Sequence, residues 1–170
     1  ALGPGSSPSA RRAAADQALR IAKREGWTDN RRAFAHYAKG RLLQPVDSQA
    51  AHQQYLIADS FYARSRQTRL HRAYVATQLS AYELSTGNLG QARTIASRNI
   101  SAARAGQNAA LLSTLQLITA EALQAEGRAS QARKLRLDSL GWARYGFGSD
   151  WAVRSKMREI ATLAPAKPPA

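Results

Sequence analysis

GNLGQAR at residues 87–93 and GRASQAR at residues 127–133 are two copies of one short stretch. In each copy a glycine stands first and an alanine follows five positions later, at Ala92 and Ala132. Both copies lie between runs of residues with helical periodicity. We expect the glycine to end one helix, and the small alanine to let the next helix pack back against it. The stretch therefore predicts a joint in an array of stacked helical pairs.

Apolar residues recur at spacings of three and four along most of the chain, which predicts helices rather than strands. The expected helices cover about 10–25, 30–43, 48–66, 68–86, 88–105, 108–126, 128–145 and 150–163. Alternate helices begin at a regular interval of about 40 residues, which is in the range of helical-hairpin repeats. The sequence thus predicts an all-α fold of about eight antiparallel helices.

Small residues support this regular interval. We expect Gly26, Gly106 and Gly146 to end helices, and they lie one or two such intervals apart. A second series of small residues has the same interval: Gly40, Ser80 and Ala120. Small side chains at regular positions allow helices to approach closely where they cross.

The length of 170 residues is typical of one domain. We expect a disordered lead or linker over 1–9, a helical repeat domain over 10–163 and a disordered tail over 164–170, because both ends are rich in glycine, proline or serine. The chain has no cysteine, which excludes disulfides and thiolate metal sites. No run of about 18 apolar residues predicts a membrane span.

The chain has 25 Lys and Arg against 11 Asp and Glu, a net charge of +14. A charge of this size attracts phosphates, anionic lipid headgroups or acidic proteins. The alternative is a compositional bias of the genome, which spreads arginine over solvated faces. The arginines do not collect in one segment, which favours this alternative.

These features together resemble a tetratricopeptide (TPR) repeat protein. Ser80, Gly87, Ala92 and Asn99 fit the small-residue pattern of one repeat. The next repeat fits at Ala120, Gly127, Ala132 and Ser139. A degenerate copy surrounds Gly40, and the interval is longer than that of the family, which is usually about 34 residues. The resemblance covers about 30–163 and implies a superhelix of helix pairs.

The resemblance also implies a concave groove lined by the second, fourth and sixth helices, which would hold an extended or helical segment of another protein. The implied groove residues are Tyr37, Arg41, Tyr74, Thr77, Thr114, Leu117, Glu121 and Gln124, with Phe34 beside them. For Phe34, Tyr74 and Leu117, packing in the core is the alternative.

The sequence offers no constellation of residues for catalysis. The three histidines lack the spacing of a helical zinc motif, and the acidic residues occur singly. The segment Gly146–Asp150 precedes a helix but lacks the lysine of a phosphate-binding loop. We therefore expect neither an enzyme nor a bound cofactor or metal.

Four aromatic residues gather near the C-terminus: Trp142, Tyr145, Phe147 and Trp151. We expect them to plug the open end of the array, since terminal repeats need a cap. The alternative is an exposed docking patch. Four arginines are candidates for contact with an anion, because they share helix faces at spacings of three or four: Arg69, Arg72, Arg154 and Arg158.

The sequence therefore predicts a protein-interaction scaffold or adaptor with a partner that is acidic. The alternative is a basic protein that binds nucleic acid or an anionic surface. Arginine and alanine content suggests a bacterial source. The lead rich in small residues favours an envelope or periplasmic location over the cytoplasm.

Overall fold

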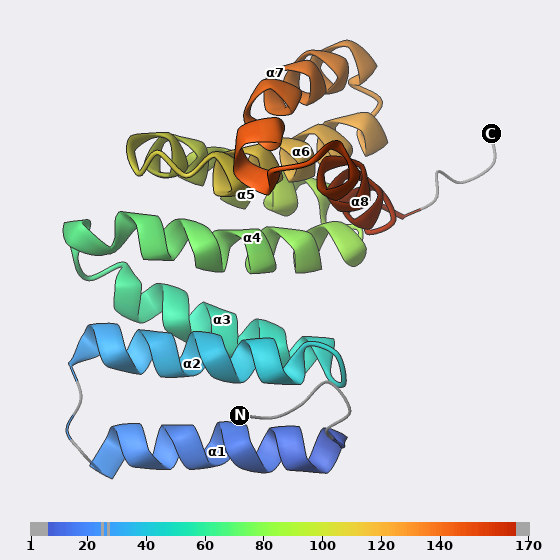
Figure 1. Ribbon diagram of the computed structural model, residues 1–170. Coiled ribbons are helices and arrows are strands. Elements are labelled where there is room, and N and C mark those ends of the chain that lie inside the picture. Colours follow the sequence, from blue (N-terminus) through green and yellow to red (C-terminus); the bar gives the residue numbers. More distant parts are fainter. Residues whose placement is uncertain (1–6, 25, 27, 166–170) are drawn as a thin grey trace. The chain divides into compact units, whose positions relative to one another are not determined.

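The computed structural model describes residues 7–24, 26 and 28–165, and Figure 1 shows that this part of the chain is built from helices without strands. Its elements are α1 (Pro8–Arg24), α2 (Asp29–Leu43), α3 (Ser48–Tyr62), a 3-10 turn (Arg66–Thr68), α4 (Arg69–Ser85), α5 (Leu89–Ala105), α6 (Ala109–Ala125), α7 (Ala129–Phe147) and α8 (Asp150–Ala161). The predicted all-α class with eight helices is confirmed within the described residues.

The chain divides into two compact units between Val75 and Ala76, inside α4. The first unit contains α1–α3 and the start of α4, and the second contains the rest of α4 and α5–α8. The assignment of 10–163 to one repeat domain, like the superhelix, stays a prediction.

In the first unit, α2 packs against both α1 and α3, as Figure 1 shows. The crossing of α2 and α3 depends on Gly40, because a β-carbon there would lie 2.5 Å from the ring of Tyr55. Tyr55 is 2% exposed, and its hydroxyl donates a hydrogen bond to Gln44 Oε1 at 2.9 Å. The small residue predicted at position 40 therefore has a direct packing role.

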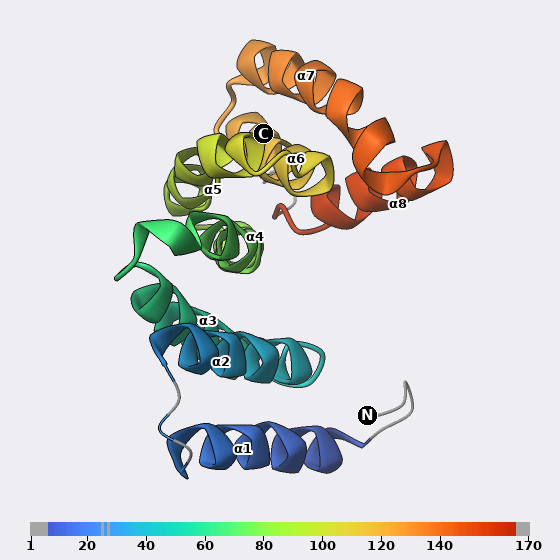
Figure 2. The ribbon, with the colours of Figure 1, turned by 60° about the vertical axis from the view of Figure 1, so that its left-hand side comes forward.

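In the second unit, α6 is the central helix. It packs against α5, α7 and α8 (Figure 2). Nearly every residue from Leu111 to Leu123 is buried. The end of α7 approaches the start of α6 so closely that a β-carbon on Gly146 would overlap the backbone of Ala109 and Ala110. Contact on several sides explains why α6 is the most apolar helix.

The turns of the second unit repeat one geometry at an even interval. Helices start at Arg69, Leu89, Ala109 and Ala129, and α4, α5 and α6 have the same length of 17 residues. The residue that turns the chain has a positive φ each time: Gly87 (82°), Gln107 (51°) and Gly127 (81°). The following amide donates back to a carbonyl in the last turn of the helix, as in Asn88 N to Glu83 O at 2.9 Å. This is the Schellman pattern, which satisfies carbonyls at a helix end.

One predicted helix end is corrected, and another is confirmed. Gly146 does not end a helix, since α7 continues to Phe147 and the left-handed residue is Gly148, with φ 75°. Helix α5 ends at Ala105 with Gly106 as its C-cap, as predicted, although Gly106 has φ −78° and the next residue, Gln107, takes the left-handed conformation. A glycine in register therefore does not always supply the left-handed residue of the turn.

Other boundaries differ by a few residues. Helix α1 starts at Pro8, slightly before its predicted start, and α3 ends at Tyr62 instead of about 66. Most of the predicted disordered segments 1–9 and 164–170 lies outside the described residues, namely 1–6 and 166–170, as does Glu25, the predicted end of the first helix. Pro8 and Ser9 belong to α1, which corrects the end of the predicted lead.

Candidate interaction surfaces

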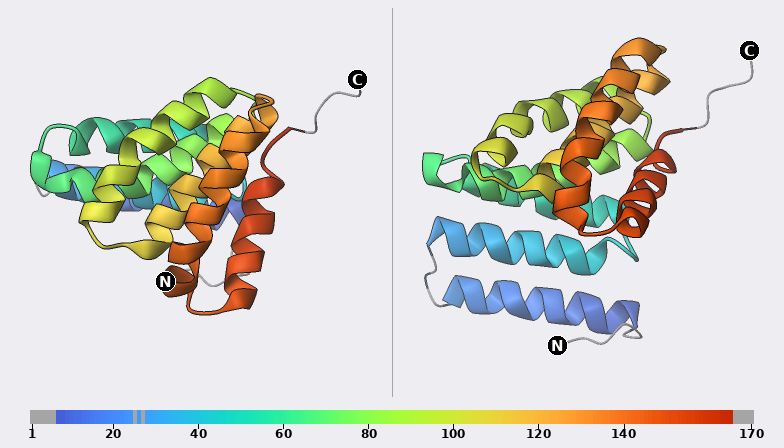
Figure 3. Two further views of the ribbon diagram at one scale, coloured as in Figure 1. Left: turned by 90° about the horizontal axis from the view of Figure 1, so that it is seen from above. Right: turned by 45° about the horizontal axis from the view of Figure 1, so that its top comes forward.

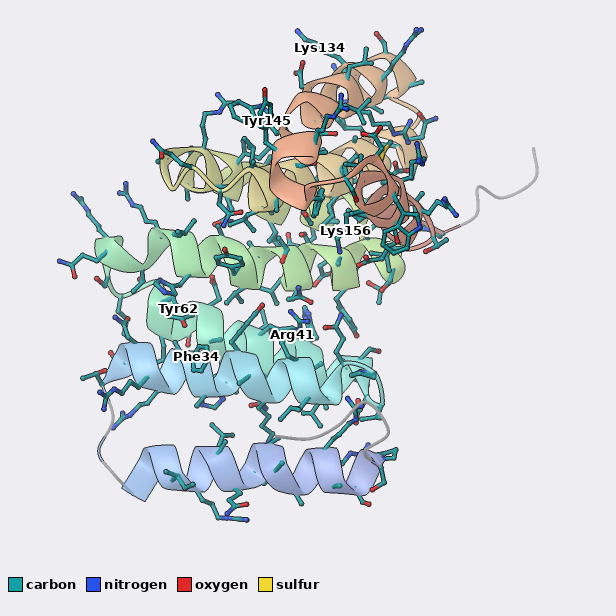
Figure 4. The ribbon with its side chains drawn as sticks, in the orientation of Figure 1. Phe34, Arg41, Tyr62, Lys134, Tyr145 and Lys156 are labelled. Carbon is teal, nitrogen blue, oxygen red and sulfur yellow. The ribbon has the colours of Figure 1, made fainter. Side chains whose placement is uncertain are left out.

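One face of α2 carries an exposed aromatic residue and an arginine. Phe34, Tyr37 and Arg41 are spaced by three and four residues, so they share a helix face. Phe34 is 60% exposed, Tyr37 is half-buried and Arg41 is exposed. Figure 4 shows Phe34 and Arg41 on the same side of the helix. We call these three residues the α2 stripe.

The base of the α2 stripe is held by the packing below it. Arg41 Nη1 donates to the Tyr37 hydroxyl at 3.4 Å, and the Tyr37 ring lies 5.8 Å from the ring of Tyr55. Burial raises the pKa of Tyr55 above its ordinary value of 10.0, so this phenol stays neutral. The stripe therefore combines a packed aromatic base with an exposed charged end.

The two groove candidates of α4 differ in exposure. Tyr74, in the first unit, is 40% exposed, whereas Thr77, in the second, is only 8% exposed. Phe34 and Tyr74 are separated by one full interval of the expected repeat, so they occupy equivalent positions. The sequence register therefore relates two exposed aromatic residues of the first unit.

The groove candidates on α6 are less accessible to a partner than the exposed residues of α2. Leu117 is 2% exposed, which corrects its expected place in a groove: α6 has neighbours on several sides, so its apolar face is core. Glu121 forms an ion pair with Arg136, whose Nη2 lies 2.8 and 2.9 Å from the two carboxylate oxygens. Thr114 is half-buried and bonded within its own helix. Gln124 is exposed and accepts from Arg136 at 3.4 Å.

The C-terminal aromatic residues do not form the expected plug. Tyr145 is 86% exposed, Trp151 71% and Trp142 44%, and only Phe147 is half-buried. The buried face of α7 consists instead of three small residues: Ala132, Ser139 and Ala143. Because these residues pack against the unit, the aromatic residues fall on the outer side of the helix. The exposure that the alternative expected is observed, and the docking role of the cluster stays a prediction.

The four anion-contact candidates fall into two pairs. Arg72 forms a bidentate pair with Asp59, at 2.7 and 3.0 Å, and the hydrogen bond to Asp59 raises the pKa of Arg72. Arg69 is exposed beside it. Arg154 and Arg158 are exposed on α8, and neither forms an ion pair with any described residue. Arg154 and Arg158 on α8 are therefore more accessible to an anion than Arg69 and Arg72.

Sequence reasoning missed Leu137, and it placed Leu140 wrongly on the packed face of its helix together with Ala132. Leu137 is 60% exposed and Leu140 39% exposed on the outer face of α7. The available signal was their spacing from Arg133 and Arg144, because 133, 137, 140 and 144 follow steps of four, three and four on one face. Apolar residues in register with arginines fit an outer face better than a core.

No family model matches the sequence, and no curated protein or solved structure is detectably similar to it. The resemblance to TPR proteins thus stays a prediction. Within the part of the chain that the structure describes, no group of three or more metal-ligating side chains comes together. Among those same residues, no helix has the length and hydropathy to cross a bilayer.

Proposed function

We propose that the chain is a TPR-like interaction scaffold that binds an acidic segment of a partner protein along the α2 stripe. The observation that carries this proposal is the 60% exposure of Phe34 on the same helix face as Arg41. An aromatic anchor next to an arginine is typical of the residues that dominate binding energy at interfaces.

Phe34, Arg41 and the net charge contribute to binding of the peptide in different ways. Covering the exposed part of the Phe34 side chain contributes roughly 1–2 kcal/mol. Arg41 supplies a planar donor group for a carboxylate of the partner. The net charge of +14 speeds the encounter with an acidic segment and disfavours basic ones. The expected ligand is therefore an acidic peptide segment that contains an apolar residue.

The test uses a displayed library of short peptides selected against the whole chain. We expect the selected peptides to be enriched in Asp and Glu and to contain an apolar residue. Arg41→Glu should weaken their binding about tenfold or more, and Phe34→Ala should do the same. The matched control is Arg32→Glu, which makes the same charge change at an exposed position on the opposite side of α2.

The control separates a local site from general attraction to a basic protein. Arg32→Glu should keep most of the affinity. Equal losses for Arg41→Glu and Arg32→Glu, or selected peptides without acidic residues, would contradict the proposal. Circular dichroism of each variant shows whether the helices are retained.

A further inference from the structure

The outer face of α7 combines apolar residues with cations. Leu137 and Leu140 lie between Arg133 and Arg144 on one face, at steps of four, three and four. Tyr145 stands next to Arg144 and is the most exposed large apolar residue among those described, at 86%. Figure 4 shows Lys134 and Tyr145 projecting from this helix. A face of this kind is unusual for a helix that only meets water.

The outer face of α8 has the same character. Trp151, Arg154 and Arg158 are spaced by three and four residues and are all exposed, with Trp151 at 71%. On the opposite side, Val153 and Ile160 are buried, which fixes the orientation of the helix on its unit. Like charges at positions 154 and 158 repel each other modestly, so an anion near both would be favourable.

The two faces belong to one hairpin. Helices α7 and α8 run antiparallel and pack on each other (Figure 3), and the Gly148–Ser149 turn joins them. Arg144 Nε lies 3.6 Å from Asp150 Oδ1, which ties the end of α7 to the start of α8. Tyr145 and Trp151 therefore extend from the same end of the hairpin.

We infer that the α7–α8 hairpin docks on an anionic lipid bilayer. Residues 129–161 hold seven Lys and Arg against three Asp and Glu, a local net charge of +4 that complements such a surface. Tryptophan and tyrosine favour the headgroup region, and arginine pairs with lipid phosphates. The exposed leucines decide between anionic partners, because they gain by entering lipid and contribute no stacking on nucleic acid bases.

The test measures sedimentation of the whole chain with phosphatidylcholine vesicles, with and without phosphatidylglycerol. We expect binding only to the vesicles with phosphatidylglycerol. Arg154→Gln/Arg158→Gln should weaken it by about five-fold per arginine, hence roughly 25-fold. The matched control is Arg98→Gln/Arg104→Gln, which removes the same charge from exposed α5 positions that form no ion pair with the described residues. The control should lose less than about three-fold.

A second readout follows insertion of the aromatic residue. Tryptophan emission should shift to shorter wavelength when phosphatidylglycerol vesicles are added, and Trp151→Phe should remove most of the shift. Leu137→Ser should weaken vesicle binding about three-fold or more without changing the helical signal.

Three outcomes overturn the inference. The first is equal binding to both vesicle types, and the second is an equal loss for the α8 and α5 double variants. The third is an absence of vesicle binding, in which case tight binding of a single-stranded oligonucleotide would assign the hairpin to nucleic acid instead.

Discussion

Two glycines of α7 differ in what surrounds their α-carbons. A β-carbon at Gly146 would overlap the backbone of Ala110, whereas nothing lies within 4 Å of one at Gly141. We expect Gly146→Ala to lower the free energy of unfolding by about 1–3 kcal/mol, because helix backbone cannot move aside cheaply. Gly141→Ala, in the same helix, should raise it by up to about 1 kcal/mol. Urea unfolding measures both, and a stabilising Gly146→Ala would contradict the close approach.

The turn residue Gln107 carries a backbone conformation that glycine adopts at the equivalent positions. Its φ is 51°, against 82° at Gly87 and 81° at Gly127. A side chain in this region costs roughly 1–2 kcal/mol, part of which the flexibility of glycine in the unfolded chain offsets. We expect Gln107→Gly to raise the melting temperature and Gly87→Ala to lower it. A destabilising Gln107→Gly would show that this side chain makes a compensating contact.

At this scale the sequence predicted the turns only where glycine marks them. The copies at Gly87 and Gly127 indicated the joint correctly. The turn at Gln107 has the same hydrogen bonds, but the predicted glycine, Gly106, caps the helix with a negative φ, and the next residue takes the left-handed conformation. Gly146 was assigned to a turn, although it provides space at a helix crossing. Sequence alone does not distinguish these two uses of glycine.

At the scale of the elements, the α2–α3 pair contains a pH-dependent contribution. Burial raises the pKa of Tyr55, and also that of Tyr62, above the ordinary 10.0. The folded state thus retains protons that the unfolded chain releases, so stability is full below about pH 10 and falls as the pH rises further. Urea unfolding between about pH 8 and pH 11 should show this decline.

The variant Tyr55→Phe isolates this effect. It should cost about 1 kcal/mol near neutral pH, because the hydrogen bond to Gln44 is lost. It should also reduce the alkaline decline, since one of the two shifted phenols is gone. Tyr145→Phe, at a residue 86% exposed, is the control and should keep the wild-type profile. An unchanged decline in Tyr55→Phe would contradict the assignment.

The contact between α6 and α7 includes an ion pair that should differ in strength from the one at the hairpin turn. Both carboxylate oxygens of Glu121 accept hydrogen bonds from Arg136, and the Glu121 side chain is only 12% exposed. The Arg144–Asp150 pair is longer, at 3.6 Å, and both side chains are mostly exposed. We expect Arg136→Gln to cost about 1–3 kcal/mol in unfolding free energy and Arg144→Gln less than about 0.5 kcal/mol. Equal costs, measured by urea unfolding, would contradict the difference in burial.

Helix positions could be predicted well from sequence, but helix orientation less so. Apolar periodicity is local, and the predicted starts lie close to the observed ones at Pro8, Asp29 and Ala129. The aromatic cluster around Trp151 was placed wrongly, because large apolar residues were assumed to be inside. The small residues of α7 take the buried face and leave the aromatic residues outside.

At the scale of the whole molecule, the candidate site could be predicted only in part. The all-α class follows from repeated local signals, whereas exposure depends on how many neighbours each helix has. The α2 stripe is exposed at Phe34 and Arg41, and its role as a binding face stays a prediction, while Leu117 is buried because α6 is surrounded. The spacing of apolar residues along one helix does not show how many other helices pack against it, or which of its residues are buried.

The most direct test of the proposed scaffold function is nuclear magnetic resonance mapping of an acidic peptide selected against the chain. The account predicts that chemical-shift changes gather at Phe34, Tyr37 and Arg41, and that Arg32, on the opposite side of α2, changes little. Changes that gather outside α2, or that spread evenly over the basic residues, would contradict a defined binding site on this helix.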